Sequence, residues 1–233
     1  MGEIYWDLGG FNIFMDSKYK DLYQVEDDFY NLIGSENFSG LSANDWFLVD
    51  KETKELSFLL LTVPSLFYPL LDEEVERVGV LFPVFLEDLN AEGIVIPMQE
   101  KAFYSCEKDV LFVTNSREGA SYLVEISQDF YLVLDKYKKY IGYFLKNASR
   151  HIPESSPNMY QTGFMNALRE ILLFCNDDAY GLMEDKDKET LASLKKLYTH
   201  CKELENNEPR VSGILHFLEN ALYTFYDIDV ASC

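Results

Sequence analysis

The sequence predicts an α+β protein, with a mostly antiparallel sheet and two helices in the N-terminal part and a three-helix region in the C-terminal part. Short apolar runs separated by turn residues fill residues 1–126. From residue 127 onward, apolar side chains recur every three or four positions, as on one side of a helix. A stretch rich in proline and serine, residues 149–158, separates the two parts.

The N-terminal segment predicts a β-hairpin followed by a helix. Residues 3–8 and 11–16 are apolar runs on either side of Gly9-Gly10, which can take the positive φ angles of a two-residue turn. After Ser17, a candidate N-cap, the apolar side chains follow helical spacing up to Gly34. The expected buried stripe of this helix consists of Tyr19, Leu22, Tyr23, Phe29, Tyr30 and Ile33.

Strands dominate the next hundred residues. Residues 46–50 and 56–63 predict a second hairpin, and its second strand is apolar on both sides, as in a strand that is covered on both faces. Residues 84–90 suggest a short helix. The remaining strand-like segments are residues 77–82, 93–98, 102–106, 110–114 and 121–126.

Residues 127–150 are predicted to form the second helix of the N-terminal part. Ser127 is a candidate N-cap and Asp129 adds an acid to the first turn. The apolar stripe runs through Phe130, Leu134, Tyr137, Ile141, Phe144, Leu145 and Ala148. The same segment contains most of the basic residues of this region, which we expect to be solvated or to neutralise acids elsewhere.

Three further helices are predicted at residues 160–175, 191–204 and 214–225, each with one apolar side. The expected organisation is an α+β domain over residues 1–150, a linker over residues 151–158 and a helical region over residues 159–233. Short helices of this kind need partners for their apolar sides. The helical region is therefore expected to pack on itself or to form one unit with the first domain.

The net charge of the chain limits the classes of molecule that we expect it to bind. The chain of 233 residues has 40 acids against 20 bases, a formal net charge of −20. Nucleic acids and anionic membrane surfaces would be repelled, so we expect neither as a direct partner. The first residues lack a secretory signal, and the longest uncharged run, residues 56–71, is too short to span a membrane. Four cysteines without a C-x-x-C pair suit a reducing compartment, and we expect a cytoplasmic protein.

No catalytic or metal-binding motif is present. The chain lacks the phosphate-binding glycine motifs, the G-x-S-x-G nucleophile motif and the H-E-x-x-H zinc motif. Residues 185–189 alternate acids and lysines, but without the glycine and glutamate of a calcium loop they suit the start of a helix. We therefore expect no cofactor, no metal and no catalytic residue, although carboxylates dispersed along the sequence leave an enzyme possible.

Two acidic clusters interleaved with apolar residues are the candidate binding residues. An acidic surface beside aromatic side chains is typical of a protein that binds a basic protein. Aromatic residues followed by proline and acids, around residues 67–76, are expected to be the exposed part of this surface. The partner-binding residues predicted in this way are Glu26, Asp27, Asp28, Phe67, Tyr68, Asp72, Glu73, Glu74 and Glu76.

The leading hypothesis is a non-catalytic, acidic binding protein that neutralises or regulates a basic protein partner, such as a toxin or nuclease, in the manner of immunity proteins and antitoxins. The resemblance to those proteins is one of charge, not of sequence. A metal-dependent hydrolase using dispersed carboxylates is one alternative. An adaptor whose C-terminal helices dock a partner helix is the other.

Overall fold

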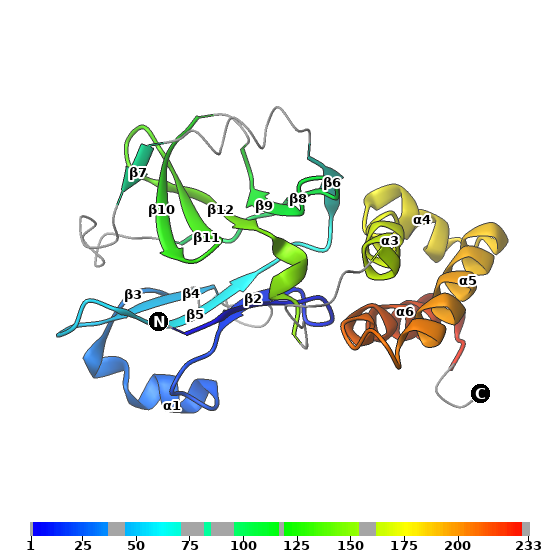
Figure 1. The fold of residues 1–233 in the computed structure, drawn as a ribbon, viewed down its shortest axis with the longest axis horizontal. Coiled ribbons are helices and arrows are strands. Elements are labelled where there is room, and N and C mark those ends of the chain that lie inside the picture. Colours follow the sequence, from blue (N-terminus) through cyan, green and yellow to red (C-terminus); the bar gives the residue numbers. More distant parts are fainter. Residues whose placement is uncertain are drawn as a thin grey trace.

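The computed structural model describes residues 2–36, 45–70, 82–84, 96–116, 119–153 and 162–229. It contains two sheets of mostly antiparallel strands, one above the other, and a group of helices beside them (Figure 1). The α+β class is therefore confirmed. The helices are concentrated in the C-terminal part, as predicted.

The first sheet has five strands in the order β1-β2-β5-β4-β3, and every neighbouring pair is antiparallel. Both predicted hairpins of this region, β1–β2 and β4–β5, are present. A short helix, α1 (Leu22–Asp27), lies on the side of this sheet that faces away from the second sheet (Figure 1). The strands are β1 (Ile4–Asp7), β2 (Asn12–Met15), β3 (Leu32–Glu36), β4 (Trp46–Asp50) and β5 (Leu56–Thr62).

The second sheet has seven strands in the order β6-β8-β9-β12-β11-β10-β7. Its five central strands are antiparallel, and the two short edge strands, β6 and β7, pair in parallel. The predicted strands at residues 102–106, 110–114 and 121–126 belong to this sheet. The strands are β6 (Phe67–Pro69), β7 (Phe82–Val84), β8 (Ala102–Ser105), β9 (Val110–Thr114), β10 (Ala120–Ser127), β11 (Phe130–Asp135) and β12 (Tyr140–Lys146).

The predicted helix over residues 127–150 is wrong: this segment forms the hairpin β11–β12 and a 3-10 turn, η4 (Ala148–His151). Its apolar side chains alternate between the two faces of the sheet, and both faces are covered, so spacings of two, three and four all occur. The hairpin turn is held by the Asp135 carboxylate, which accepts hydrogen bonds from the backbone N–H groups of Tyr137 and Lys139. Lys138 takes a φ of 61°, which no right-handed helix contains.

The predicted helix after Ser17 is much shorter than expected. α1 begins after Asp21, whose side chain accepts a hydrogen bond from the N–H of Gln24, so Asp21 rather than Ser17 is the N-cap. The helix ends at Asp27 and is followed by a 3-10 turn, η1 (Phe29–Asn31), and by β3. The last residues of the predicted helix, from Leu32 onward, instead form β3 and pair with β4.

The C-terminal region contains the three predicted helices and one more. They are α3 (Thr162–Leu172), α4 (Asp177–Glu184), α5 (Lys188–Leu204) and α6 (Val211–Tyr226). The additional helix, α4, is capped by Asn176, which accepts from the N–H of Ala179. Its eight residues bury only Ala179 and Met183, so the sequence shows little of an apolar stripe. Asp187 caps α5, as expected for residues 185–189.

One apolar core joins the facing sides of both sheets to the C-terminal helices. Trp6 of β1, Leu61 of β5, Tyr143 of β12 and Leu218 of α6 all belong to it. Two smaller clusters lie on the outer sides of the sheets, and one of them holds α1 against β4. The division of the chain at residues 151–158 into two domains is not tested by this packing and stays a prediction.

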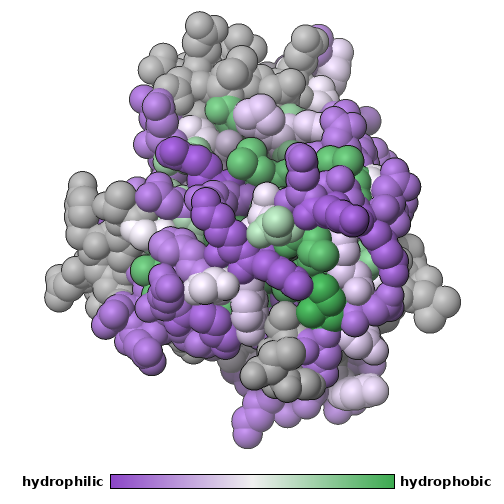
Figure 2. Space-filling view, turned by 90° about the vertical axis from the view of Figure 1, so that its right-hand side faces the viewer, coloured by the Kyte–Doolittle hydropathy of each residue, from purple (hydrophilic) through white to green (hydrophobic). Residues whose placement is uncertain are grey.

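Several expectations fall wholly or largely outside the described residues. Of the predicted strand 77–82 and the predicted helix 84–90, only Phe82 and Val84 are described, and both belong to β7. Of residues 93–98, the described part, 96–98, is not a strand. No helix within the described ranges is long and apolar enough to cross a membrane. Figure 2 looks onto the helical end, where apolar patches are interrupted by hydrophilic side chains.

Candidate partner-binding surface

The structure places the two predicted aromatic binding residues on opposite faces of β6. Phe67 is 6% exposed and belongs to the main core, where its ring lies 6.4 Å from that of Trp6. Tyr68 points to the other side of the sheet and packs against Phe103, with ring centroids 5.6 Å apart. Successive side chains of a strand point to opposite faces, so the two rings cannot act as one surface. Phe67 is not the exposed aromatic that we expected.

The acidic clusters are only partly described. Glu26 and Asp27 lie on α1 and are exposed. Asp28 follows α1, and its carboxylate is occupied by hydrogen bonds within the chain. It accepts from Tyr19 Oη at 2.6 Å, Asn31 Nδ2 at 2.7 Å and Lys18 Nζ at 3.1 Å. The hydrogen bond from Tyr19 is the largest cause that lowers the pKa of Asp28 to about 2. The other cluster, Asp72, Glu73, Glu74 and Glu76, lies outside the described residues.

Two exposed tyrosines accompany the acids of α1. Tyr23 is 78% exposed and Tyr30 is 86% exposed. Tyr23 lies three and four positions before Glu26 and Asp27, a spacing that puts these side chains on the same side of a helix. Tyr30 follows in η1. We call the group of Tyr23, Glu26, Asp27 and Tyr30 the α1 surface.

Sequence reasoning missed this aromatic part of the site. The helical spacing assigned Tyr23 and Tyr30 to a buried stripe, but α1 buries Val25 instead, against Trp46 and Leu48 of β4. A signal was present in the polar residues. Asp21 and Asp28 both favour helix ends, and reading them as such would have shortened the helix and changed which residues are buried.

The ring of Tyr30 already holds a cation. Lys51 Nζ lies 5.0 Å from the centroid of the Tyr30 ring and also donates a hydrogen bond to the Tyr30 carbonyl oxygen. An ammonium group over a tyrosine ring is attracted by the negative face of the ring. The α1 surface thus combines exposed carboxylates with a ring that accepts a basic side chain, which is the chemistry that recognises lysine and arginine.

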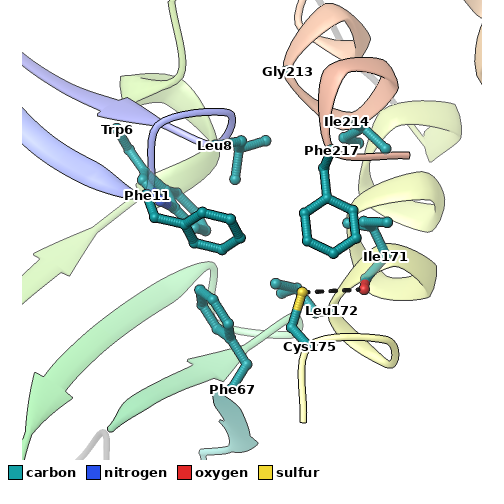
Figure 3. Close-up of a pocket in the computed structure, with 10 residues that line it drawn as sticks. All are labelled: Trp6, Leu8, Phe11, Phe67, Ile171, Leu172, Cys175, Gly213, Ile214 and Phe217. Carbon is teal, nitrogen blue, oxygen red and sulfur yellow. Dashed lines mark hydrogen bonds between the residues drawn. The ribbon is translucent and has the colours of Figure 1, made fainter. Parts of the chain in front are cut away.

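A small apolar cavity lies between the β1–β2 hairpin and the helices α3 and α6 (Figure 3). Its volume is about 20 Å³, which is room for a single water-sized group. Cys175 is the only thiol in its lining, and burial raises the pKa of that thiol to about 12, so it is not a reactive thiolate. The cavity is lined by Trp6, Leu8, Phe11, Phe67, Ile171, Leu172, Cys175, Gly213, Ile214 and Phe217.

A buried polar cluster connects the second sheet to α6. The Asp109 carboxylate accepts from Tyr104 Oη at 2.7 Å and from the N–H and Oγ of Ser149 at 2.9 and 2.7 Å. The Ser149 carbonyl oxygen accepts from Arg210 Nη1 at 2.8 Å, and Arg210 also forms a buried ion pair with Glu208. Ser149 is buried, and its hydroxyl donates to the same Asp109 carboxylate that accepts from Tyr104. The cluster is a structural link.

The described residues contain no group of three histidine, cysteine, aspartate or glutamate side chains that could hold a metal ion. The described cysteines, Cys106, Cys175 and Cys201, are free thiols. No protein-family model matches the chain, and no curated protein does. The α1 surface is therefore assessed on its own chemistry.

Proposed function

We propose that the protein binds a basic protein partner through the α1 surface and acts without catalysis, as immunity proteins and antitoxins do with a toxin or nuclease. The observation that carries the proposal is the occurrence of two largely exposed tyrosines and two exposed carboxylates within residues 23–30, on α1 and the following η1. Tyrosine contributes a large rigid contact area and acids select a positive partner. The net charge of −20 favours association with such a partner over long range.

The test compares two charge-reversed variants with equal changes in net charge. Glu26→Lys with Asp27→Lys alters the α1 surface. Glu184→Lys with Glu203→Lys alters exposed acids on α4 and α5, where added lysines near helix C-termini are well tolerated. Each protein is used to capture partners from source-cell lysate at low salt, and the Kd of each identified partner is measured. Poly-L-lysine serves as the probe for charge alone.

We expect a basic partner whose Kd rises at least tenfold for the α1 variant and less than twofold for the control. Tyr23→Ala with Tyr30→Ala should weaken the same complex without changing net charge. If the partner is an enzyme, one equivalent of wild-type protein should inhibit it. If both charge-reversed variants weaken partner binding equally, as they would weaken binding to poly-L-lysine, then only the overall charge is recognised. This result would refute binding through the α1 surface.

A further inference from the structure

Positive charge gathers at the turn between β11 and β12. Lys136, Lys138 and Lys139 lie within four consecutive residues, all of which are exposed. Within the described ranges, none of these lysines forms an ion pair with an acid. They therefore do not neutralise acids elsewhere in the part of the chain that the structure describes. We call residues 136–139 the hairpin tip.

The backbone of the hairpin tip is held in one conformation by Asp135. Besides the two N–H groups that donate to the Asp135 carboxylate, the N–H of Lys138 donates to the Asp135 carbonyl oxygen at 3.0 Å. The N–H of Asp135 donates in turn to the Lys139 carbonyl oxygen at 2.9 Å. A turn fixed by four hydrogen bonds presents its side chains from a defined backbone, so little backbone order has to be gained on binding.

The strands around the hairpin tip carry no acid near it. Described residues 110–116, 119–124, 130–134 and 140–145, on β9 to β12, contain no aspartate or glutamate. Glu118, outside the described residues, follows Arg117 in the sequence. At physiological ionic strength, charges separated by more than about 8 Å are largely screened from each other. The three lysines outnumber Asp135, so the potential at the hairpin tip is positive although the whole chain is acidic.

An aromatic ring stands among these lysines. Tyr137 is 72% exposed, and Lys136 Nζ lies 4.9 Å from the centroid of its ring. An exposed tyrosine offers a large rigid contact area, and its hydroxyl can donate a hydrogen bond to a carboxylate. Lysine ammonium groups donate to carboxylates as well. The hairpin tip thus presents several donors for carboxylates beside one apolar contact.

We propose that the hairpin tip binds an acidic segment of a protein. The site is separate from the α1 surface, because α1 lies on the side of the first sheet that faces away from the second sheet (Figure 1). A short acidic segment meets only the local positive potential. A nucleic acid carries closely spaced phosphates along its whole length, and those beyond the hairpin tip would face the acids of the rest of the chain. The inference goes beyond the proposed function and does not depend on it.

Titration of the full-length protein with hexaglutamate tests this site. The backbone amide signals are followed by NMR at low salt, and hexathymidylate is the second probe, for a nucleic acid of the same length. Lys136→Gln with Lys139→Gln alters the hairpin tip. The matched control is Lys195→Gln with Lys196→Gln, two exposed neighbouring lysines of α5, which changes the net charge by the same amount.

We expect hexaglutamate to shift the amide signals of the hairpin tip in a saturable way. Its Kd should rise about fivefold for the tip variant and less than about twofold for the control, since each exposed charge pair contributes little. Tyr137→Ala should also weaken binding, without changing the net charge. The proposal is overturned if no saturable shift occurs at the hairpin tip or if both lysine variants weaken binding equally. Tighter binding of hexathymidylate than of hexaglutamate at the same residues would overturn it in favour of a nucleic-acid site.

Discussion

Asp28 and Asp45 have the same side chain and opposite environments. Asp28 is surrounded by donors from Tyr19, Asn31 and Lys18, which hold its pKa low. Asp45 is buried, and burial raises its pKa although hydrogen bonds from Thr62 oppose this. Ionised Asp28 stabilises the fold above its unfolded pKa, and this contribution is lost only as the pH falls toward 2. Acid titration should therefore show the two groups acting in opposite directions.

Arg210 is the residue whose substitution we expect to lower the free energy of unfolding most. Its guanidinium donates to Glu208 at 2.8 and 3.2 Å and to the Ser149 carbonyl oxygen at 2.8 Å, and it lies 4.0 Å from the ring centroid of Phe164. Arg210→Ala leaves Glu208 buried without its counter-charge, which typically costs about 3–5 kcal/mol. Urea unfolding followed by circular dichroism measures this change.

The double variant Arg210→Met with Glu208→Leu provides the control for that prediction. It removes both charges and keeps apolar volume, so it should destabilise the protein less than Arg210→Ala alone. If the double variant is the less stable of the two, then the ion pair itself, rather than the avoidance of an unpaired charge, supports the fold.

At the scale of elements, the hairpin β11–β12 shows where sequence reasoning fails. The hairpins β1–β2 and β4–β5 were predictable because glycines or a polar run mark their turns and the flanking runs are short. In residues 127–150 the turn is made by Lys138 and the Asp135 side chain, without glycine or proline. A strand covered on both faces is apolar at every spacing, so periodicity alone does not separate it from a helix.

Only part of the candidate site could be predicted from the sequence. The acids Glu26 and Asp27 were found from charge, which does not depend on the fold. The exposed tyrosines beside them were missed, because exposure depends on where α1 ends and which residue it turns toward β4. Phe67 was assigned to the surface because Pro69 and nearby acids suggested a loop, whereas its parallel pairing with β8 buries it. Long-range pairing of this kind has no local signal.

Lys138→Gly distinguishes the hairpin from the helix by experiment. Within a helix, glycine would lower the free energy of unfolding by about 1 kcal/mol. At a φ of 61° glycine relieves a conformation that side chains disfavour, so we expect stability to be kept or slightly raised. Thermal unfolding of the variant decides between these outcomes, and Lys136→Gly, in the same turn but without a positive φ, is the control.

At the scale of the whole molecule, the net charge of −20 opposes the compact state through repulsion. Salt screens exposed charges, with a Debye length of about 10 Å at 0.1 M. The Tm should therefore rise as NaCl increases from about 0.01 M to 0.2 M. Calorimetry at pH 7.5 measures it, and repeating the series nearer the calculated isoelectric point of 4.4 should give a smaller rise. A Tm that falls with salt at pH 7.5 would mean that attractive pairs outweigh the repulsion.

The contact between the first hairpin and the last helix has a consequence for synthesis. Leu8 packs next to Gly213, where an added Cβ would lie 3.2 Å from the Leu8 Cβ, and the rings of Phe11 and Phe217 lie 5.8 Å apart. A ribosome makes the hairpin first and α6 some two hundred residues later, which takes on the order of 10 s or more at about 5–20 residues per second. Until α6 emerges, the nascent chain carries an uncovered aromatic surface, and completion of this part of the core waits for the translation of Val211–Tyr226.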